Sequence, residues 1–266
     1  MPDIKRILFP VDFSQRAIGA ARYVESIAGR FDAEIMLLHV VDLATHVSLA
    51  PRVQPHIQTQ LESFLADEFK LFTTRRVCTV GDPAEEIVKA VQSWDPDLVM
   101  MPSYGLGFFR PSLLGSVTAK VLHDVACPVW TSVHSEEAPP LESIRYAKVL
   151  CALDLGKRSH HVFDWARSFA SEYQADLGIV HATPWVEAPQ FVAEARNWIA
   201  ALLEPTATTA TVLIQGGEAA KTVACAAKEF QADLLVIGRG AGDDNGYLGH
   251  SAYNMLRESP CPVISI

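Results

Sequence analysis

The amino-acid sequence predicts an α/β protein made of two tandem doubly wound sandwiches, each with a five-stranded parallel sheet. Two observations lead to this prediction: the chain of 266 residues repeats itself once, and within each copy short apolar runs alternate with amphipathic stretches. Near-continuous apolar strands alternating with amphipathic helices indicate a parallel sheet covered on both faces. With 49% hydrophobic and 20% charged residues, the chain can bury a sizeable core.

The repeat is clearest at two apolar runs. The run 7–14 (ILFPVDFS) is echoed by 149–156 (VLCALDLG), and His39 by His181, in both cases 142 positions later. Later segments of the two copies match at offsets of 136 and then 134 positions. Because a repeat of about 130 residues has the size of an ordinary domain, we interpret the chain as two copies of one domain, the second with trimmed loops.

The elements of the first copy follow in order. An apolar run at 6–11 has the length of a strand, and Ser14 after it can accept a bond from the N–H groups that begin a helix. Apolar residues at i, i+3, i+4 spacing give the next helix, 15–30, one apolar face. Pro83 can open a helix because the first turn tolerates proline. The other expected elements are strands at 34–41, 77–80, 98–101 and 129–133, and helices at 54–74 and 117–124.

The second copy repeats this order. Its expected strands are 147–153, 178–182, 211–213, 234–237 and 263–266. Between the copies, the segment 134–140 is polar and ends in two prolines, which is typical of a stiff linker. We therefore expect domain 1 over 1–135 and domain 2 over 141–266.

Charge and hydropathy exclude several classes of protein. Lys and Arg number 22 against 31 Asp and Glu, a net charge of −9 that repels nucleic acid at long range. No apolar run reaches the ~18 residues that a membrane-spanning helix needs, and the first residues lack the pattern of a secretory signal. We expect a cytoplasmic protein without nucleic-acid or membrane partners.

Candidate binding groups lie just after the predicted strands, because open parallel sheets bind ligands beyond the carboxyl ends of their strands, where the strand order reverses. In the first copy these groups are Asp12, Val40, the segment 102–105 and the start of the last helix at 115–118. A helix N-terminus presents N–H groups and a positive dipole end to an anion, and glycines such as Gly105 let backbone approach phosphates closely.

Each of these features also has a purely structural interpretation. Gly115 and Ser116 could simply build a loop and a helix cap, and Asp12 could share in capping the first helix. Asp154 repeats Asp12 in the second copy, which suits either interpretation. The sequence has no G-x-x-x-x-G-K-[ST] motif, which excludes a nucleotide hydrolase of the Walker type.

The runs 7–14, 37–40 and 101–117, closed by 126–129, resemble the universal stress protein family, twice over nearly the whole chain. The resemblance implies the adenine nucleotide alpha hydrolase-like fold and a stress-response regulator that binds ATP, ADP or AMP, with or without Mg²⁺, in domain 1. ATP-binding members carry a G-x-x-G-x9-G-[ST] element, whose later part is matched by Gly105, nine further residues and Gly115-Ser116. The implied nucleotide-binding residues are Pro10, Val11, Asp12, Val40, Met101, Ser103, Gly105, Gly115, Ser116, Val117 and Thr118.

The chain departs from the family pattern at several positions. Pro102 replaces the first glycine of the element and removes an N–H donor, and Tyr104 replaces the usual histidine. In the second copy Ala241 stands in place of a glycine, the loop to Gly249 is two residues shorter, and 243–244 are both Asp. Because these carboxylates repel phosphate, we expect the second site to be degenerate or to take another ligand.

Three functions compete at this point. The first is a nucleotide-binding regulator that needs no catalytic residue. The second is a slow ATP hydrolase or nucleotidyl transferase, which would need a base and cations where the candidate loop offers only Arg110 and the more distant Lys120. The third is an interaction module without a working site, in which the last strands, 129–133 and 263–266, serve as edges for self-association or for pairing of the two domains. These strands could equally be ordinary interior strands.

Overall fold

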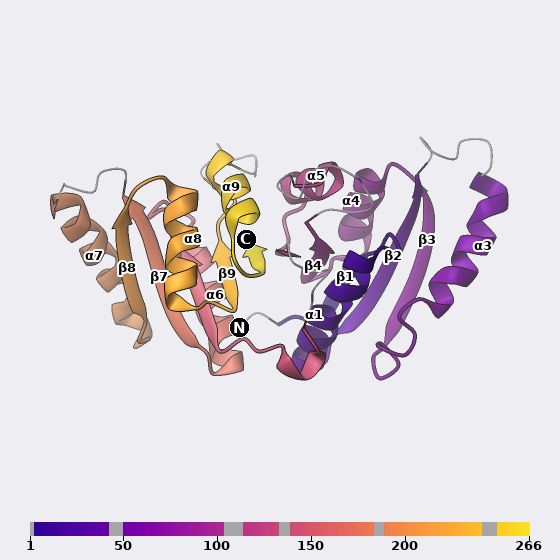
Figure 1. Ribbon diagram of the computed structural model, residues 1–266, viewed down its shortest axis with the longest axis horizontal. Coiled ribbons are helices and arrows are strands. Elements are labelled where there is room, and N and C mark those ends of the chain that lie inside the picture. Colours follow the sequence, from indigo (N-terminus) through magenta and orange to yellow (C-terminus); the bar gives the residue numbers. More distant parts are fainter. Residues whose placement is uncertain (1–2, 43–49, 104–113, 133–138, 184–188, 241–248) are drawn as a thin grey trace. The chain divides into compact units, whose positions relative to one another are not determined.

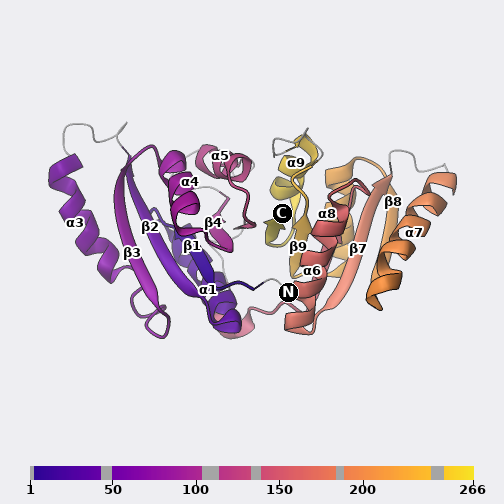
Figure 2. The ribbon, with the colours of Figure 1, turned by 180° about the vertical axis from the view of Figure 1, so that it is seen from behind.

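The computed structural model describes residues 3–42, 50–103, 114–132, 139–183, 189–240 and 249–266, with only the backbone of 50–54. The chain divides into two compact units, Asp3–Ile144 and Arg145–Ile266. Figure 1 and Figure 2 show a sheet in each unit with helices packed against it. Both units have the predicted α/β fold.

The first unit contains a parallel sheet in the order β3-β2-β1-β4-β5. Its strands are β1 (Arg6–Pro10), β2 (Glu34–Asp42), β3 (Thr74–Gly81), β4 (Leu98–Pro102) and β5 (Val129–Ser132), and its helices are α1 (Gln15–Phe31), α3 (Ala50–Ser63), α4 (Pro83–Trp94), α5 (Ser116–Asp124) and the 3₁₀ turn η2 (Leu141–Ser143). The strand order reverses between β1 and β4, and right-handed crossovers place α4 and α5 on the face opposite α1.

The second unit repeats this topology, with the order β8-β7-β6-β9-β10. Its strands are β6 (Lys148–Ala152), β7 (Asp176–Thr183), β8 (Thr211–Gly216), β9 (Leu234–Ile237) and β10 (Val263–Ser265), and its helices are α6 (Ser159–Tyr173), α7 (Pro189–Leu203), α8 (Ala219–Phe230), α9 (His250–Glu258) and the 3₁₀ turn η3 (Glu204–Thr206). The fold class predicted from the sequence is confirmed. The domain limits and the use of β5 and β10 as pairing edges stay predictions.

The repeat extends to individual hydrogen bonds. In the first unit, Asp97 accepts the backbone N–H groups of Lys5 and Arg6, both at 2.8 Å. In the second, Asp233 accepts those of Ala147 and Lys148, both at 2.9 Å. One carboxylate thus fixes the start of the first strand beside the fourth strand in each unit.

The helix predicted over 54–74 is wrong in its second half, because α3 ends at Ser63. Leu65 has a left-handed backbone (φ 55°), which a continuing helix does not allow. Arg76 of β3 then donates from Nε to the Leu61 carbonyl at 3.1 Å and from Nη2 to that of Phe64 at 3.4 Å. A side chain from the next strand therefore satisfies the carbonyls that end the helix.

Candidate functional site

The candidate site lies at the carboxyl edge of the first sheet, where the strand order reverses. There β1 and β4 are neighbours, with Leu8 paired to Val99, so that Asp12 and Ser103 follow adjacent strands. The backbone N–H of Gly115 donates to the carbonyl of Ser103 at 2.8 Å, which joins the start of α5 to the end of β4. The structure thus brings the predicted Asp12, Ser103 and Gly115 segments to one edge of the sheet.

Helix α5 begins without a side-chain cap among the described residues. Its N-cap residue is Gly115, with φ −60° and ψ 145°, and the first intrahelical bond runs from Ala119 N–H to the Gly115 carbonyl at 2.8 Å. The N–H groups of a first helical turn have no acceptor within the helix, and the helix dipole adds positive potential there. An exposed hydroxyl, that of Ser116, stands at the same end. This terminus is suited to an anion such as phosphate.

Two other predicted hydroxyls are buried. Thr118 is 2% exposed, and its Oγ1 donates to the carbonyl of Pro102 at 3.1 Å, so its proton holds α5 against the end of β4. Ser103 is fully buried, and its Oγ has no hydrogen-bond partner within the described residues. A buried hydroxyl without a partner is costly, and Ser103 is therefore a polar group that a ligand could satisfy. Their contacts with a nucleotide stay predictions.

The turn after β1 positions Asp12. Its Oδ1 accepts the backbone N–H of Ser14 at 3.1 Å, and Ser14 Oγ in turn accepts that of Ala17 at 3.2 Å and caps α1. The second unit repeats the turn, with Asp154 Oδ1 accepting from Gly156 N–H at 2.8 Å. In the folded chain Asp12 braces the N-cap residue, while Ser14 makes the cap itself. A contact of Asp12 with a ligand stays a prediction.

A histidine that the sequence did not assign to the site holds this turn. His39 of β2 places Nδ1 2.8 Å from the Val11 carbonyl, so Nδ1 is the protonated nitrogen. Its ring lies 4.4 Å from that of Phe13, which has a left-handed backbone (φ 61°). Such a conformation costs about 1 to 3 kcal/mol in a non-glycine residue and persists because the surrounding contacts hold it. The recurrence of His39 as His181 was the sequence signal for this contact.

Burial lowers the pKa of His39 below its ordinary 6.5, and the hydrogen bond to Val11 and the charge of Asp12 oppose this effect. When the folded-state pKa is the lower one, the unfolded chain takes up the proton first as the pH falls. The free energy of unfolding then decreases as the pH drops through about 6.5.

We expect the His39→Asn variant, which does not titrate, to lose less stability than the wild type between about pH 7.5 and pH 5.5. Urea unfolding of both proteins at each pH measures the difference. An equal loss in the two proteins would contradict a depressed pKa at His39.

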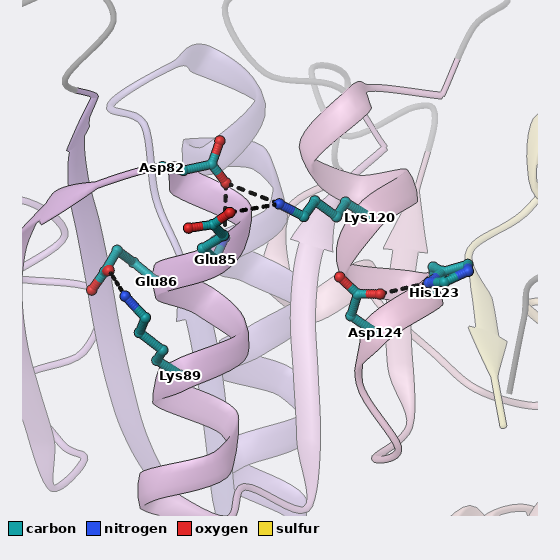
Figure 3. A network of polar contacts seen from close by, with 7 residues as sticks. All are labelled: Asp82, Glu85, Glu86, Lys89, Lys120, His123 and Asp124. Carbon is teal, nitrogen blue, oxygen red and sulfur yellow. Dashed lines mark hydrogen bonds and ion pairs between the residues drawn. The ribbon is translucent and has the colours of Figure 1, made fainter. Parts of the chain in front are cut away.

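The cation nearest to the start of α5 in sequence is engaged elsewhere. Lys120 Nζ lies 3.5 Å from Asp82 Oδ1 and 3.3 Å from Glu85 Oε1. Figure 3 shows its side chain reaching from α5 to the start of α4. Asp82 also caps α4 by accepting the N–H of Glu85 at 2.9 Å, the largest effect that lowers the pKa of Asp82. Lys120 thus pairs with the N-cap carboxylate of α4 and with a carboxylate of its first turn.

The second unit has a different group at the end of its fourth strand. Gly249 begins α9 without a side-chain cap among the described residues, and its N–H donates to the carbonyl of Arg239 at 2.7 Å. Arg239 takes the position of Ser103, and its Nε and Nη2 lie 3.4 Å from the hydroxyl and the carbonyl of Ser265. A guanidinium in one unit therefore replaces a hydroxyl in the other.

Several predicted features lie outside the described residues: Gly105, Tyr104 and Arg110 in the first copy, and Ala241, Asp243 and Asp244 in the second. In the parts of the chain that are described, no three His, Cys, Asp or Glu side chains are placed to hold a metal ion. None of the helices described there combines the length and the apolar character that crossing a membrane requires.

The fold and the site define a tandem doubly wound α/β protein with a helix N-terminus at the switch point of its first sheet, where the described residues supply no side-chain cap. The model of the universal stress protein family matches residues 3–132 and again 145–266. The chain therefore belongs to the universal stress protein family, as its motifs predicted.

The chain is similar to several known proteins. A universal stress protein of Methanocaldococcus jannaschii is 30% identical over 149 residues, which is 47% of this chain and 92% of the relative. The crystal structure of a universal stress protein from Archaeoglobus fulgidus covers 98% of this chain and 97% of its own, with a TM-score of 0.80 and 25% identity. A universal stress protein solved in complex with cAMP covers 45% of this chain and 94% of its own, with 26% identity and a TM-score of 0.36.

Proposed function

We propose that this protein is a stress-response regulator that binds ATP, ADP or AMP in its first unit. The observation that carries the proposal is the start of α5, a helix N-terminus without a side-chain cap in the described residues, joined to the switch point by the bond from Gly115 to Ser103. Phosphates would lie against this terminus, and Asp12 on the neighbouring strand end would hold the adenosine part. Family membership supports the same assignment.

The charged residues described near the site favour nucleotide binding over fast hydrolysis. Phosphoryl transfer needs cations that neutralise charge on the transferred group, together with a group that orients the nucleophile. Lys120, the candidate cation in the described residues, pairs with Asp82 and Glu85 instead. The charge of a triphosphate would then require Mg²⁺ from solution, whereas AMP carries less charge to compensate.

Isothermal titration with ATP, ADP and AMP, each with and without Mg²⁺, tests the proposal. We expect one site per chain and a weaker ATP affinity in Asp12→Ala by about 10-fold to 100-fold, the value of a hydrogen bond to a charged group. Asp12→Asn keeps an oxygen for the Ser14 N–H, so a loss in this variant too would show that the ligand needs the carboxylate charge.

The matched control is Asp154→Asn, which changes the equivalent turn of the second unit and should leave the affinity unchanged. If none of the three nucleotides binds to the wild-type protein at millimolar concentration, the proposal is wrong. The tandem interaction module would then be the better description of this chain.

A further inference from the structure

Both units hold the turn after their first strand with the same side chain. His39 Nδ1 donates to the Val11 carbonyl at 2.8 Å, and His181 Nδ1 donates to the Leu153 carbonyl at the same distance. The carbonyl in each case belongs to the residue directly before the aspartate of the turn. The contact therefore recurs in both units, although Arg239 replaces Ser103 at the end of the fourth strand.

The geometry of the turn depends on this contact. Phe13 follows Asp12 with a left-handed backbone (φ 61°), and Leu155 has the same φ of 61° in the second unit. Bulky residues avoid this region, so neighbouring contacts must keep the turn in place. In the first unit those contacts are the bond from His39 to Val11 and the packing of the Phe13 ring against His39, at 4.4 Å, and against Phe64, at 5.0 Å.

The direction of the Asp12 carboxylate follows from the turn. Its Oδ1 accepts the N–H of Ser14, one residue beyond the left-handed Phe13. A change of the Val11 or Phe13 backbone would therefore rotate the carboxylate relative to the end of β4. The chain of contacts runs from His39 through the Val11 carbonyl to Asp12.

We propose that His39 is a positioning residue of the nucleotide site, which fixes the turn that carries Asp12 without touching the ligand. This inference rests on the proposed nucleotide binding. It goes further because it makes the affinity for the adenosine part depend on a side chain of β2 that acts through the turn and Asp12. A site prepared in advance loses less free energy on binding than one that must be ordered by its ligand.

Four variants of the full chain test this role by titration with ATP and AMP. We expect His39→Leu, which lacks the donor, to weaken both affinities by about tenfold or more. His39→Asn, whose amide nitrogen can take the place of Nδ1, should stay within about threefold of the wild type. His39→Gln, whose amide reaches further, should behave like His39→Leu. His181→Leu removes the equivalent bond in the second unit and should leave both affinities unchanged.

The outcomes separate this inference from the proposed function. Wild-type affinity in His39→Leu, or an equal loss in His181→Leu, overturns the positioning role while nucleotide binding stands. Absence of binding to the wild-type chain overturns both. If His39→Leu does not fold, the comparison of His39→Asn with His39→Gln decides, provided that both unfold at the temperature of the wild type, because a purely structural role predicts no loss of affinity at unchanged stability. Nitrogen NMR of the His39 ring gives a readout without nucleotide, and a proton on Nε2 instead of Nδ1 would refute the contact.

Discussion

The Gly115→Glu variant should lose ATP affinity by about 100-fold or more while it folds like the wild type. Gly115 has φ −60° and ψ 145°, an extended conformation that any residue adopts, so the backbone accepts a side chain here. A glutamate places a negative charge at the start of α5, where the phosphates would bind. Two charges about 4 Å apart repel by about 4 kcal/mol at an effective dielectric constant of 20, and each 1.4 kcal/mol is about a tenfold change in affinity.

The second unit supplies a matched control for this variant. Gly249 begins α9 with nearly the same backbone angles, φ −66° and ψ 153°, so Gly249→Glu adds the same charge at the equivalent helix. We expect it to leave ATP binding unchanged, and Gly115→Ala to separate the effect of charge from that of a side chain. Titration measures the affinities and thermal unfolding confirms the fold. A loss in Gly249→Glu but not in Gly115→Glu would move the site to the second unit.

Most of the fold was predictable because it depends on local patterns that the chain shows twice. Each buried strand is a short apolar run, and Ser14 and Pro83 mark helix starts by chemistry that acts within a few residues. The end of α3 was not predictable in this way. It involves Arg76 of the next strand, whose guanidinium donates hydrogen bonds to carbonyls 15 and 12 positions earlier. A periodicity argument does not contain contacts of this kind.

The candidate site likewise contains residues that the sequence indicates and contacts that only the folded structure shows. Asp12 and Gly115 could be found because each directly follows a strand or begins a helix, positions where a parallel sheet binds ligands. The bond from His39 could not, because its acceptor, the Val11 carbonyl, lies 28 positions away in the turn after β1. The recurrence of His39 as His181 marked the residue but not its partner. The bond from Thr118 to the Pro102 carbonyl likewise appears only when α5 is packed against β4. Residue type thus indicates where a ligand can bind, whereas the positioning contacts follow from the packing.

Phe9→Ala should destabilise the first unit by about 3 to 5 kcal/mol, the usual cost of removing a buried phenylalanine ring. Phe9 is fully buried in β1, three positions before Asp12, and its ring packs edge to face on Phe69 at 6.2 Å. The loss combines the transfer free energy of the ring with the cost of the cavity that its removal leaves in the core. Hydrogen exchange of the β1 and β4 amides measures the change within this unit, because amides of core strands exchange by its unfolding.

Two control variants define the scale of that effect. Phe9→Leu keeps most of the volume and should cost less than about 1.5 kcal/mol. Leu71→Ala, at a residue 86% exposed, should stay within about 0.5 kcal/mol of the wild type.

A ligand that binds only the folded state stabilises it, so ATP at 100 times its Kd should restore about 2.7 kcal/mol to Phe9→Ala, if the site keeps its affinity. No restoration in Phe9→Ala, with restoration in Phe9→Leu, would show that β1 packing controls the site as well as the stability of the unit. No restoration in either variant would contradict nucleotide binding by the first unit.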